Sequence, residues 1–123
     1  MKRKFQQRKT NSLSNSDKDV MAVKDSINVI TGKWKVHIIA SLLFGGRRYS
    51  EIEKSIPTIT PRMLSKELRD LEANGIVKRR GYDSMSVTFD YELTKSGHSF
   101  RNVLQAMLDW GLQHRKNVIN GDL

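Results

Sequence analysis

The residues best suited to chemistry lie along one side of a predicted helix that begins after Thr60. Thr60 has the side chain of a helix N-cap, and Pro61 loses nothing at the first helical position by lacking an amide proton. The outward positions of this helix carry Arg62, Ser65, Lys66 and Arg69. Such a helix fits the major groove of double-stranded DNA, where arginine, lysine and hydroxyl groups hydrogen-bond to base edges. A solvated helix is the alternative, since Lys66 and Asp70 have the spacing of an ion pair, but helix stability alone gives no reason to set three cations side by side.

The side chains that usually catalyse reactions or bind metals are not arranged to do so. The chain has no cysteine, and His37, His98 and His114 stand singly within predicted helices. Neighbouring carboxylates, such as Glu51 and Glu53, lie two positions apart on helices and face different directions, so they do not converge as acid and base. We therefore expect a protein that is not an enzyme and that uses no cofactor or metal.

A helix-turn-helix is predicted to position the basic face. A short helix over residues 51–55 precedes it, with Ser50 as the N-cap and Glu53 reaching back to the Ser50 amide in a capping box. Pro57 stops this helix, because it removes a backbone donor and favours an extended conformation at the residue before it. The helix after Thr60 turns its leucines inward and ends at a glycine. Two helices joined by such a short break form a helix-turn-helix.

Further elements are predicted on both sides of this pair. Apolar residues recur at helical spacing over residues 20–30, with Ser16 or Asp17 as the cap and Gly32 at the end, and a second apolar helix face follows over residues 34–43. After the helix-turn-helix the period drops to about two residues, which is typical of strands. Residues 76–82 and 87–93 are then the strands of a hairpin, residues 83–86 form its turn, and the hairpin is the wing of a winged helix. One last helix, capped by Thr94, presents a wide apolar surface.

Three basic residues stand at the base of the predicted wing. A register that closes the turn at residues 82 and 87 also pairs Arg79 with Asp90 across the strands. Arg79 is therefore expected to be structural, and Lys78 or Arg80 is freer to approach phosphate.

The charge of the chain favours a polyanionic partner. Its 123 residues carry 22 Lys and Arg against 13 Asp and Glu, a formal net charge of +9. Residues 1–16 hold five of these cations and no acid, and they are polar enough to be predicted as a flexible basic arm that either seeks phosphate or is merely solvated. Residues 17–118 are the expected folded domain, and 119–123 the tail. The longest apolar stretch, over residues 36–44, is too short to span a membrane, so we expect a cytoplasmic protein.

Several stretches match a known pattern in order and spacing. They are Ile-Thr-Gly-Lys-Trp at 30–34, Gly-Arg-Arg-Tyr-Ser-Glu-Ile at 46–52, Ile-Thr-Pro-Arg-Met-Leu-Ser at 59–65 with Leu-Arg-Asp-Leu-Glu at 68–72, Gly-Ile-Val at 75–77, and Asp-Tyr-Glu-Leu-Thr at 90–94. Over about residues 19–114 the chain resembles the HxlR-type winged helix-turn-helix transcriptional regulators. The resemblance implies a bacterial, MarR-like, DNA-binding regulator that is mainly α-helical with a small β-hairpin.

The resemblance also completes the expected site. The DNA-binding residues would be Lys33, Ser50, Thr60, Pro61, Arg62, Ser65, Lys66, Arg69, Arg80 and Thr88. The first and last helices would form a homodimer interface through Val20, Val23, Ile27, Val103, Met107, Trp110 and His114. The apolar surface of the last helix predicts a dimer independently, because a domain this small cannot cover it.

The chain departs from the family pattern at three places. It lacks the cysteine with which many members begin the first helix, so signalling through that thiol does not carry over. The consecutive prolines and the following basic residue of the usual wing are replaced by residues 86–88, Ser-Val-Thr, so the wing is expected to be less rigid and less basic and less suited to a minor-groove contact. Gly81 stands where the family has a strand valine and gives the wing more freedom to flex.

Two other function classes remain open on the sequence. One is a regulator that responds to a small-molecule effector held near the dimer interface by Trp34, Met107 and Trp110, although aromatic residues at helical spacing are more often part of the core. The other is a winged helix that binds RNA or protein, in which the basic arm would matter more than the helix after Thr60.

Overall fold

The computed structural model describes residues 13–81 and 89–122, and these residues divide into two compact units between residues 31 and 32. The described element of the first unit is helix α1 (Asp17–Ile30). Ser16, rather than Asp17, is its N-cap, because the Ser16 hydroxyl accepts a hydrogen bond from the Asp19 amide at 3.2 Å. The helix stops before Thr31, which is extended, and Gly32 follows with φ +107°, a conformation that favours glycine.

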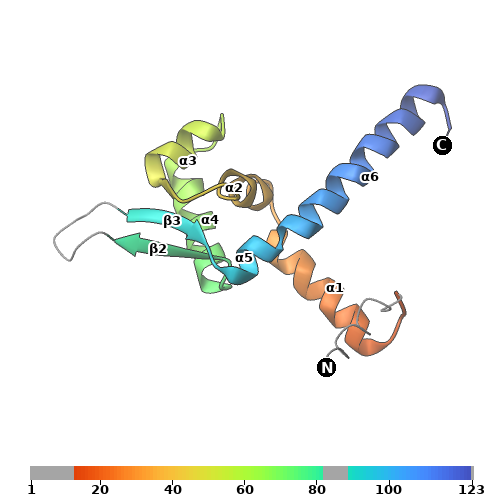
Figure 1. Cartoon of the computed structure of the whole chain (residues 1–123), viewed down its shortest axis with the longest axis horizontal. Helices are drawn as coiled ribbons and strands as arrows, with labels where there is room; N and C mark the ends of the chain where they lie inside the picture. Colours follow the sequence, from red (N-terminus) through yellow and green to blue (C-terminus); the bar gives the residue numbers. More distant parts are fainter. Residues whose placement is uncertain (1–12, 82–88, 123) are drawn as a thin grey trace. The chain divides into compact units, whose positions relative to one another are not determined.

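The second unit contains the winged helix-turn-helix and a long terminal helix (Figure 1). Its elements are α2 (Lys35–Ser41), β1 (Arg47–Arg48), α3 (Tyr49–Ser55), α4 (Pro61–Ala73), β2 (Val77–Gly81), β3 (Phe89–Leu93), α5 (Lys95–Ser99) and α6 (Arg101–Asn120). The mainly helical fold with a small antiparallel hairpin is as the sequence predicts.

The start of α4 follows the predicted local chemistry. Thr60 is extended, and its hydroxyl accepts from the Met63 amide at 3.1 Å, while Pro61 occupies the first helical position. The predicted inner face is also confirmed, since Leu64, Leu68 and Leu71 are fully or almost fully buried. Cap and leucine spacing together therefore fix both where α4 begins and which side it turns outward.

The start of α3 differs from the prediction. The helix begins at Tyr49, and the extended residue before it, Arg48, is the N-cap in place of Ser50. The carboxylate that reaches back is that of Glu51, which accepts from the Arg48 amide at 2.8 Å, so the predicted box of Ser50 and Glu53 is wrong. The reason is tertiary: Arg48 belongs to a short strand, and the helix can begin only where that strand ends.

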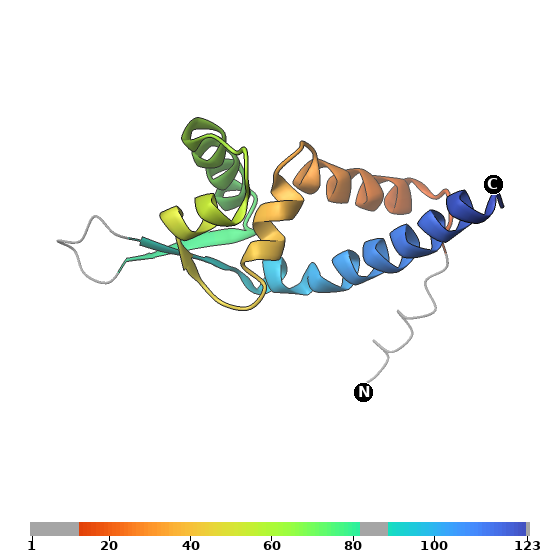
Figure 2. The same ribbon diagram turned by 90° about the horizontal axis from the view of Figure 1, so that it is seen from above.

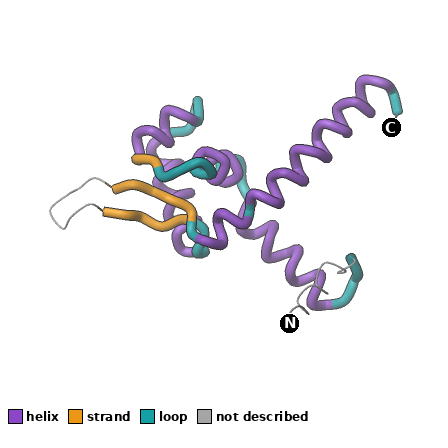
Figure 3. The backbone as a smooth tube through the Cα atoms, viewed as in Figure 1, coloured by secondary structure: helices purple, strands orange, loops and turns teal. Residues whose placement is uncertain are grey.

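The sheet has three antiparallel strands in the order β1-β3-β2 (Figure 3). The predicted register is wrong by one residue: Arg80, not Arg79, lies opposite Asp90, and Arg79 lies opposite Tyr91. The open end of the hairpin, away from the turn, explains this shift, because there the Thr94 amide donates to the Ile76 carbonyl at 2.9 Å and aligns the two strands. The predicted turn at 83–86 lies outside the described residues. β1 was not predicted, since two residues carry no alternating pattern.

The core of the second unit lies between the helices and one face of the sheet. Its buried apolar residues are Trp34, Ile38, Ile39, Leu42, Ile52, Ile56, Ile59, Leu64, Leu68, Leu71, Ile76, Val77, Leu93 and Phe100. Gly97 is part of this packing, because a Cβ there would collide with the Ile76 carbonyl oxygen and press on Leu93.

The predicted last helix is two helices. Thr94 caps α5 as expected, accepting from the Gly97 amide at 3.1 Å, but the chain tightens at Phe100, whose amide bonds to the Gly97 carbonyl three residues back. From there α6 leaves the end of the sheet as a long helix (Figure 2). It continues to Asn120, two residues beyond the expected domain boundary, and Gly121 ends it with φ +76°. Within residues 13–81 and 89–122 no helix is both long and apolar enough to cross a membrane.

Candidate nucleic-acid interface

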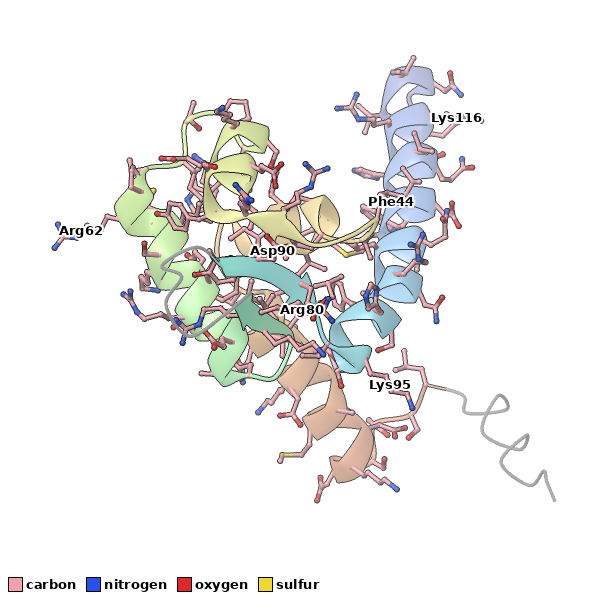
Figure 4. All side chains as sticks on the ribbon, turned by 60° about the vertical axis from the view of Figure 1, so that its left-hand side comes forward. Phe44, Arg62, Arg80, Asp90, Lys95 and Lys116 are labelled. Atoms are coloured by element: carbon pink, nitrogen blue, oxygen red, sulfur yellow. The ribbon has the colours of Figure 1, made fainter. Side chains whose placement is uncertain are left out.

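The outward face of α4 carries two arginines that have no partner in the part of the chain that the structure describes. Arg62 and Arg69 are exposed and make no hydrogen bond or ion pair with any residue of the described chain. They are seven positions apart, which places them on the same side of the helix about 10 Å apart along its axis. Figure 4 shows the Arg62 side chain extending away from α4. These guanidinium groups keep all their donors available for an external acceptor.

Lys66, between these arginines, is held by a neighbour. Its Nζ lies 3.2 Å from an oxygen of Asp70, which is the spacing that the sequence suggested. The same Asp70 oxygen is 3.4 Å from the Nζ of Lys35 on α2. Hydrogen bonds from Lys66 and then from Lys35 hold the pKa of the Asp70 carboxyl below its usual value. Lys66 can therefore reach an anion only by exchanging Asp70 for it.

A buried ion pair fastens α4 to α2 beneath this face. Lys35 and Glu67 are among the few buried charged residues, their side chains are 9% and 11% exposed, and the Lys35 ammonium donates directly to the Glu67 carboxylate. Burial works against the charge on Lys35, but hydrogen bonds and attraction from Glu67 and Asp70 outweigh it and raise the pKa of Lys35. Neither residue was predicted from the sequence to belong to the site. The signal was that each charge stands within an otherwise apolar helix face.

Ser65 is less open than predicted. It is half-buried, and its hydroxyl lies 3.0 Å from the Tyr49 hydroxyl on α3, which also donates to the Pro61 carbonyl at 2.7 Å. These contacts tie the first turn of α4 to the start of α3. Ser65 also lines a pocket of about 250 Å³ between α4 and the strands, with Leu68, Arg69, Glu72, Arg79 and Tyr91.

The cations of β2 are paired within the protein. Arg79 reaches across to α4, where its Nε lies 3.2 Å from Glu72. Lys78 and Arg80 both approach Glu92, at 3.7 and 3.5 Å. The expectation that Arg80 is freer than Arg79 is therefore wrong. Residues two positions apart on a strand lie on the same face, so Lys78 and Arg80 share the acidic neighbour Glu92.

The remaining predicted contact residues have mixed surroundings. Lys33 is exposed, and its ammonium lies 4.9 Å from the centre of the Trp34 ring. Ser50 is exposed in the first turn of α3, and Thr60 is exposed although its hydroxyl is used as the cap of α4. Thr88 lies outside the described residues. No group of three or more His, Cys, Asp or Glu side chains within the described part of the chain could hold a metal ion.

Comparison with known proteins identifies the family. The family model described as HxlR-like helix-turn-helix matches residues 29–118, well over half of the chain. The chain belongs to the HxlR-like family. The resemblance that the motifs carry is thus confirmed.

Relatives of the HxlR-like chain are named as regulators. The HTH-type transcriptional regulator YtcD of Bacillus subtilis (strain 168) is 37% identical over 98 residues, and the match covers 80% of this chain and 78% of the relative. A crystal structure of an HTH-type transcriptional regulator YtcD matches with a TM-score of 0.71 over 76% of this chain and 96% of that chain. The redox regulator HypR in its reduced form is 34% identical with a TM-score of 0.73, covering 80% of this chain and 98% of HypR. A MarR-family regulator from Enterococcus faecalis V583, 24% identical with a TM-score of 0.75 and covering 89% of this chain and 98% of that one, shows the same fold.

Within this HxlR-like chain, the residues assigned to a dimer interface are exposed. Val20, Val23 and Ile27 on α1 are 41%, 48% and 54% exposed. On α6, Val103, Met107 and Trp110 are 41%, 44% and 68% exposed, and the His114 ring stacks on Trp110 with 4.7 Å between centroids. The four residues on α6 recur at helical spacing and form one stripe.

The proposed effector residues do not share one environment. Trp34 is buried in the core at 8% exposure, whereas Trp110 and Met107 are exposed on α6. Trp34 is therefore a core residue, which is the alternative role expected for aromatic residues at helical spacing.

Proposed function

We propose that this chain is a transcriptional regulator that binds a specific double-stranded DNA operator with α4, as a homodimer. The observation that carries the proposal is the outward face of α4, where Arg62 and Arg69 have no partner among residues 13–81 and 89–122. Arginine in the major groove forms paired hydrogen bonds to the O6 and N7 atoms of guanine, and it also binds backbone phosphates. The relatives named as HTH-type transcriptional regulators support the same conclusion.

The buried ion pair supports α4 as the reading element. A helix that reads base edges must be held rigidly, because small displacements destroy hydrogen-bond geometry. Lys35 and Glu67 join α4 to α2, and the Tyr49 contacts join its first turn to α3. The arginines outside are thus presented by a helix whose opposite side is fixed by charge as well as by leucines.

The basic arm and the paired cations are proposed to act on phosphate. Residues 1–9 contribute five positive charges, and phosphate contacts of this kind add affinity without sequence preference. Lys66 would join them by exchanging Asp70 for a phosphate oxygen. The strand cations Lys78 and Arg80 are held by Glu92, so we assign the wing a smaller share of the affinity.

The apolar stripes on α1 and α6 are proposed to form the dimer. The stripe on α6 exposes Val103, Met107 and Trp110, and exposed apolar surface of this extent marks an interface. A two-fold dimer presents two copies of α4, so the operator should be a pseudo-palindrome whose half-sites are about one helical turn, or a small multiple, apart. Trp110→Asp should give monomers in analytical ultracentrifugation, and a wild-type chain that sediments only as a 14.2 kDa species would contradict this part.

The reading helix and the arm can be separated experimentally. Bound DNA is first selected from a random pool with the full chain. The ratio of operator affinity to random-DNA affinity is then measured at matched salt for a deletion of residues 2–9, for Arg62→Ala and for Lys116→Ala. Lys116 is the matched control, because it is an exposed cation on α6 (Figure 4).

The three variants should behave differently. The deletion should weaken operator and random DNA by similar factors and reduce the salt dependence, which is about 0.9 log unit per log unit of salt for each phosphate contact. Arg62→Ala should lower the ratio of affinities by a factor that corresponds to about 1 to 3 kcal/mol, and it should relax the preference for one base at one position of each half-site. Lys116→Ala should leave the ratio unchanged. The proposal is wrong if the deletion reduces the ratio of operator to random-DNA affinity to about one while Arg62→Ala preserves that ratio. It is also wrong if no motif is selected.

A further inference from the structure

The hydroxyl groups of Tyr49 and Ser65 form a short chain of hydrogen bonds at the first turn of α4. The Tyr49 oxygen lies 2.7 Å from the Pro61 carbonyl oxygen and 3.0 Å from the Ser65 oxygen. Tyr49 stands at the first position of α3, so the chain of bonds crosses from one helix of the helix-turn-helix to the other. These contacts brace the two helices, and the positions of the two hydroxyl protons add a second role.

The protons in this chain can be assigned from what each atom can do. A carbonyl oxygen only accepts, and a phenol has one proton to donate. An oxygen pair at 2.7 Å without a proton between them would be repulsive, so the Tyr49 proton points to Pro61. The contact between Tyr49 and Ser65 then has a single solution, in which Ser65 donates. Ser65 therefore has no proton left and offers only lone pairs to anything outside.

Ser65 remains within reach of a ligand. It is half-buried rather than buried, it lines the pocket beside Arg69, and it lies between Arg62 and Arg69 in the sequence of α4. On a helix these three positions fall within about 60° of one another. The face proposed to read DNA therefore carries a hydrogen-bond acceptor flanked along the helix by two donors.

We propose that Ser65 reads an exocyclic amino group of one base in each half-site, and that Tyr49 is the positioning residue that keeps the Ser65 hydroxyl an acceptor. In the major groove the amino groups are adenine N6 and cytosine N4, whereas guanine O6 and thymine O4 are acceptors that an acceptor-only hydroxyl would repel. An unconstrained serine binds either kind of group, because its proton rotates to suit. The inference rests on the proposed function, since it requires that α4 lies in the major groove.

The test replaces single atoms of the operator selected with the full wild-type chain. At each adenine, 2-aminopurine moves the amino group from the major to the minor groove, and at each cytosine, 2-pyrimidinone removes it. Wild type should lose about three- to tenfold in affinity at one such position per half-site, as expected for one hydrogen bond. Ser65→Ala should bind the unmodified operator more weakly and show no further loss at that position.

The Tyr49 variant tests the polarity itself. Tyr49→Phe frees the Ser65 proton, so guanine or thymine should become tolerated at the same position and nowhere else in a repeated selection. A general loss of stability would instead lower affinity for every sequence. Tyr91→Phe is the matched control, because it removes a phenol hydroxyl from the pocket that Ser65 lines without touching the bond between Tyr49 and Ser65, and its selected motif should equal that of wild type.

The outcomes separate this inference from the function on which it rests. If wild type selects no motif, the proposed function fails and this inference with it. The function stands and this inference is overturned in two cases. In the first, a motif is selected, but at no position does removal of an amino group cause a loss of affinity that depends on Ser65. In the second, Tyr49→Phe selects the wild-type base at every position.

Discussion

Removal of the Glu67 charge should destabilise the fold far more than removal of any exposed charge on α4. The change is Glu67→Gln, which keeps the size of the side chain and leaves Lys35 buried without its main partner. Lys35 and Glu67 are 32 positions apart in sequence, so the pair forms only when α4 packs on α2. Its loss is therefore felt in the folded state and not in the unfolded chain.

The expected magnitude is about 3 kcal/mol. Removing one partner of a buried ion pair typically costs about 3–5 kcal/mol, because the other charge stays out of water. The lower end applies here, since Asp70 remains 3.4 Å from Lys35 and is 43% exposed, which offers the ammonium a partly hydrated alternative. In urea, where small proteins show slopes of about 1–3 kcal/mol per molar, the unfolding midpoint should fall by about 1–3 M.

The assay is urea unfolding at one fixed protein concentration, because the stability of a chain that dimerises as proposed depends on concentration. Lys66→Gln is the control, because it removes the other cation that pairs with Asp70. The Lys66 side chain is 63% exposed, and exposed ion pairs of this spacing contribute about 0.3–0.5 kcal/mol to stability. The double variant Lys35→Met with Glu67→Leu should recover most of the loss, since no charge is then left unpaired. Equal costs for Glu67→Gln and Lys66→Gln would refute the reasoning, as would a double variant no more stable than the single one.

Three further outcomes follow from single contacts. Gly97→Ala should lower the melting temperature markedly or prevent soluble expression, because its Cβ has no room, whereas the neighbouring exposed Ser96→Ala should leave melting nearly unchanged. Thr60→Ala should cost about 0.5–2 kcal/mol in urea unfolding and Thr60→Ser much less; equal losses would show that the cap is not the cause. Stability measured against pH should decline at both extremes. The lowered pKa of Asp70 stabilises the fold above about pH 3.8, and this contribution is lost as pH falls through the pKa of Asp70 in the folded state. The raised pKa of Lys35 stabilises the fold below about pH 10.5, and this contribution is lost as pH rises through the pKa of Lys35 in the folded state. Asp70→Asn should flatten the acid limb, and an unchanged limb would contradict that assignment.

The sequence alone determined the features that depend on neighbours a few residues away. Thr60 and Pro61 begin α4 where they were expected to, because capping uses only the first turn of the helix. The spacing of the leucines placed Arg62 and Arg69 outward, because the helical period converts spacing directly into a face. Thr94 was recognised as a cap for the same reason. The order and spacing of these local signals were also enough to indicate the family.

Tertiary structure decided everything that depends on which segments meet. The hairpin register follows from the bond between Thr94 and Ile76 at its open end, which no alternation of residues reveals. The start of α3 follows from a two-residue strand that exists only because β3 lies beside it. The pairing of Lys35 with Glu67, and the contact between the Tyr49 and Ser65 hydroxyls, join helices whose approach is set by the packing of the whole core. A sequence lists the donors, acceptors and charges, but their partners are chosen by distance in space, and distance in space is fixed only when the chain has folded.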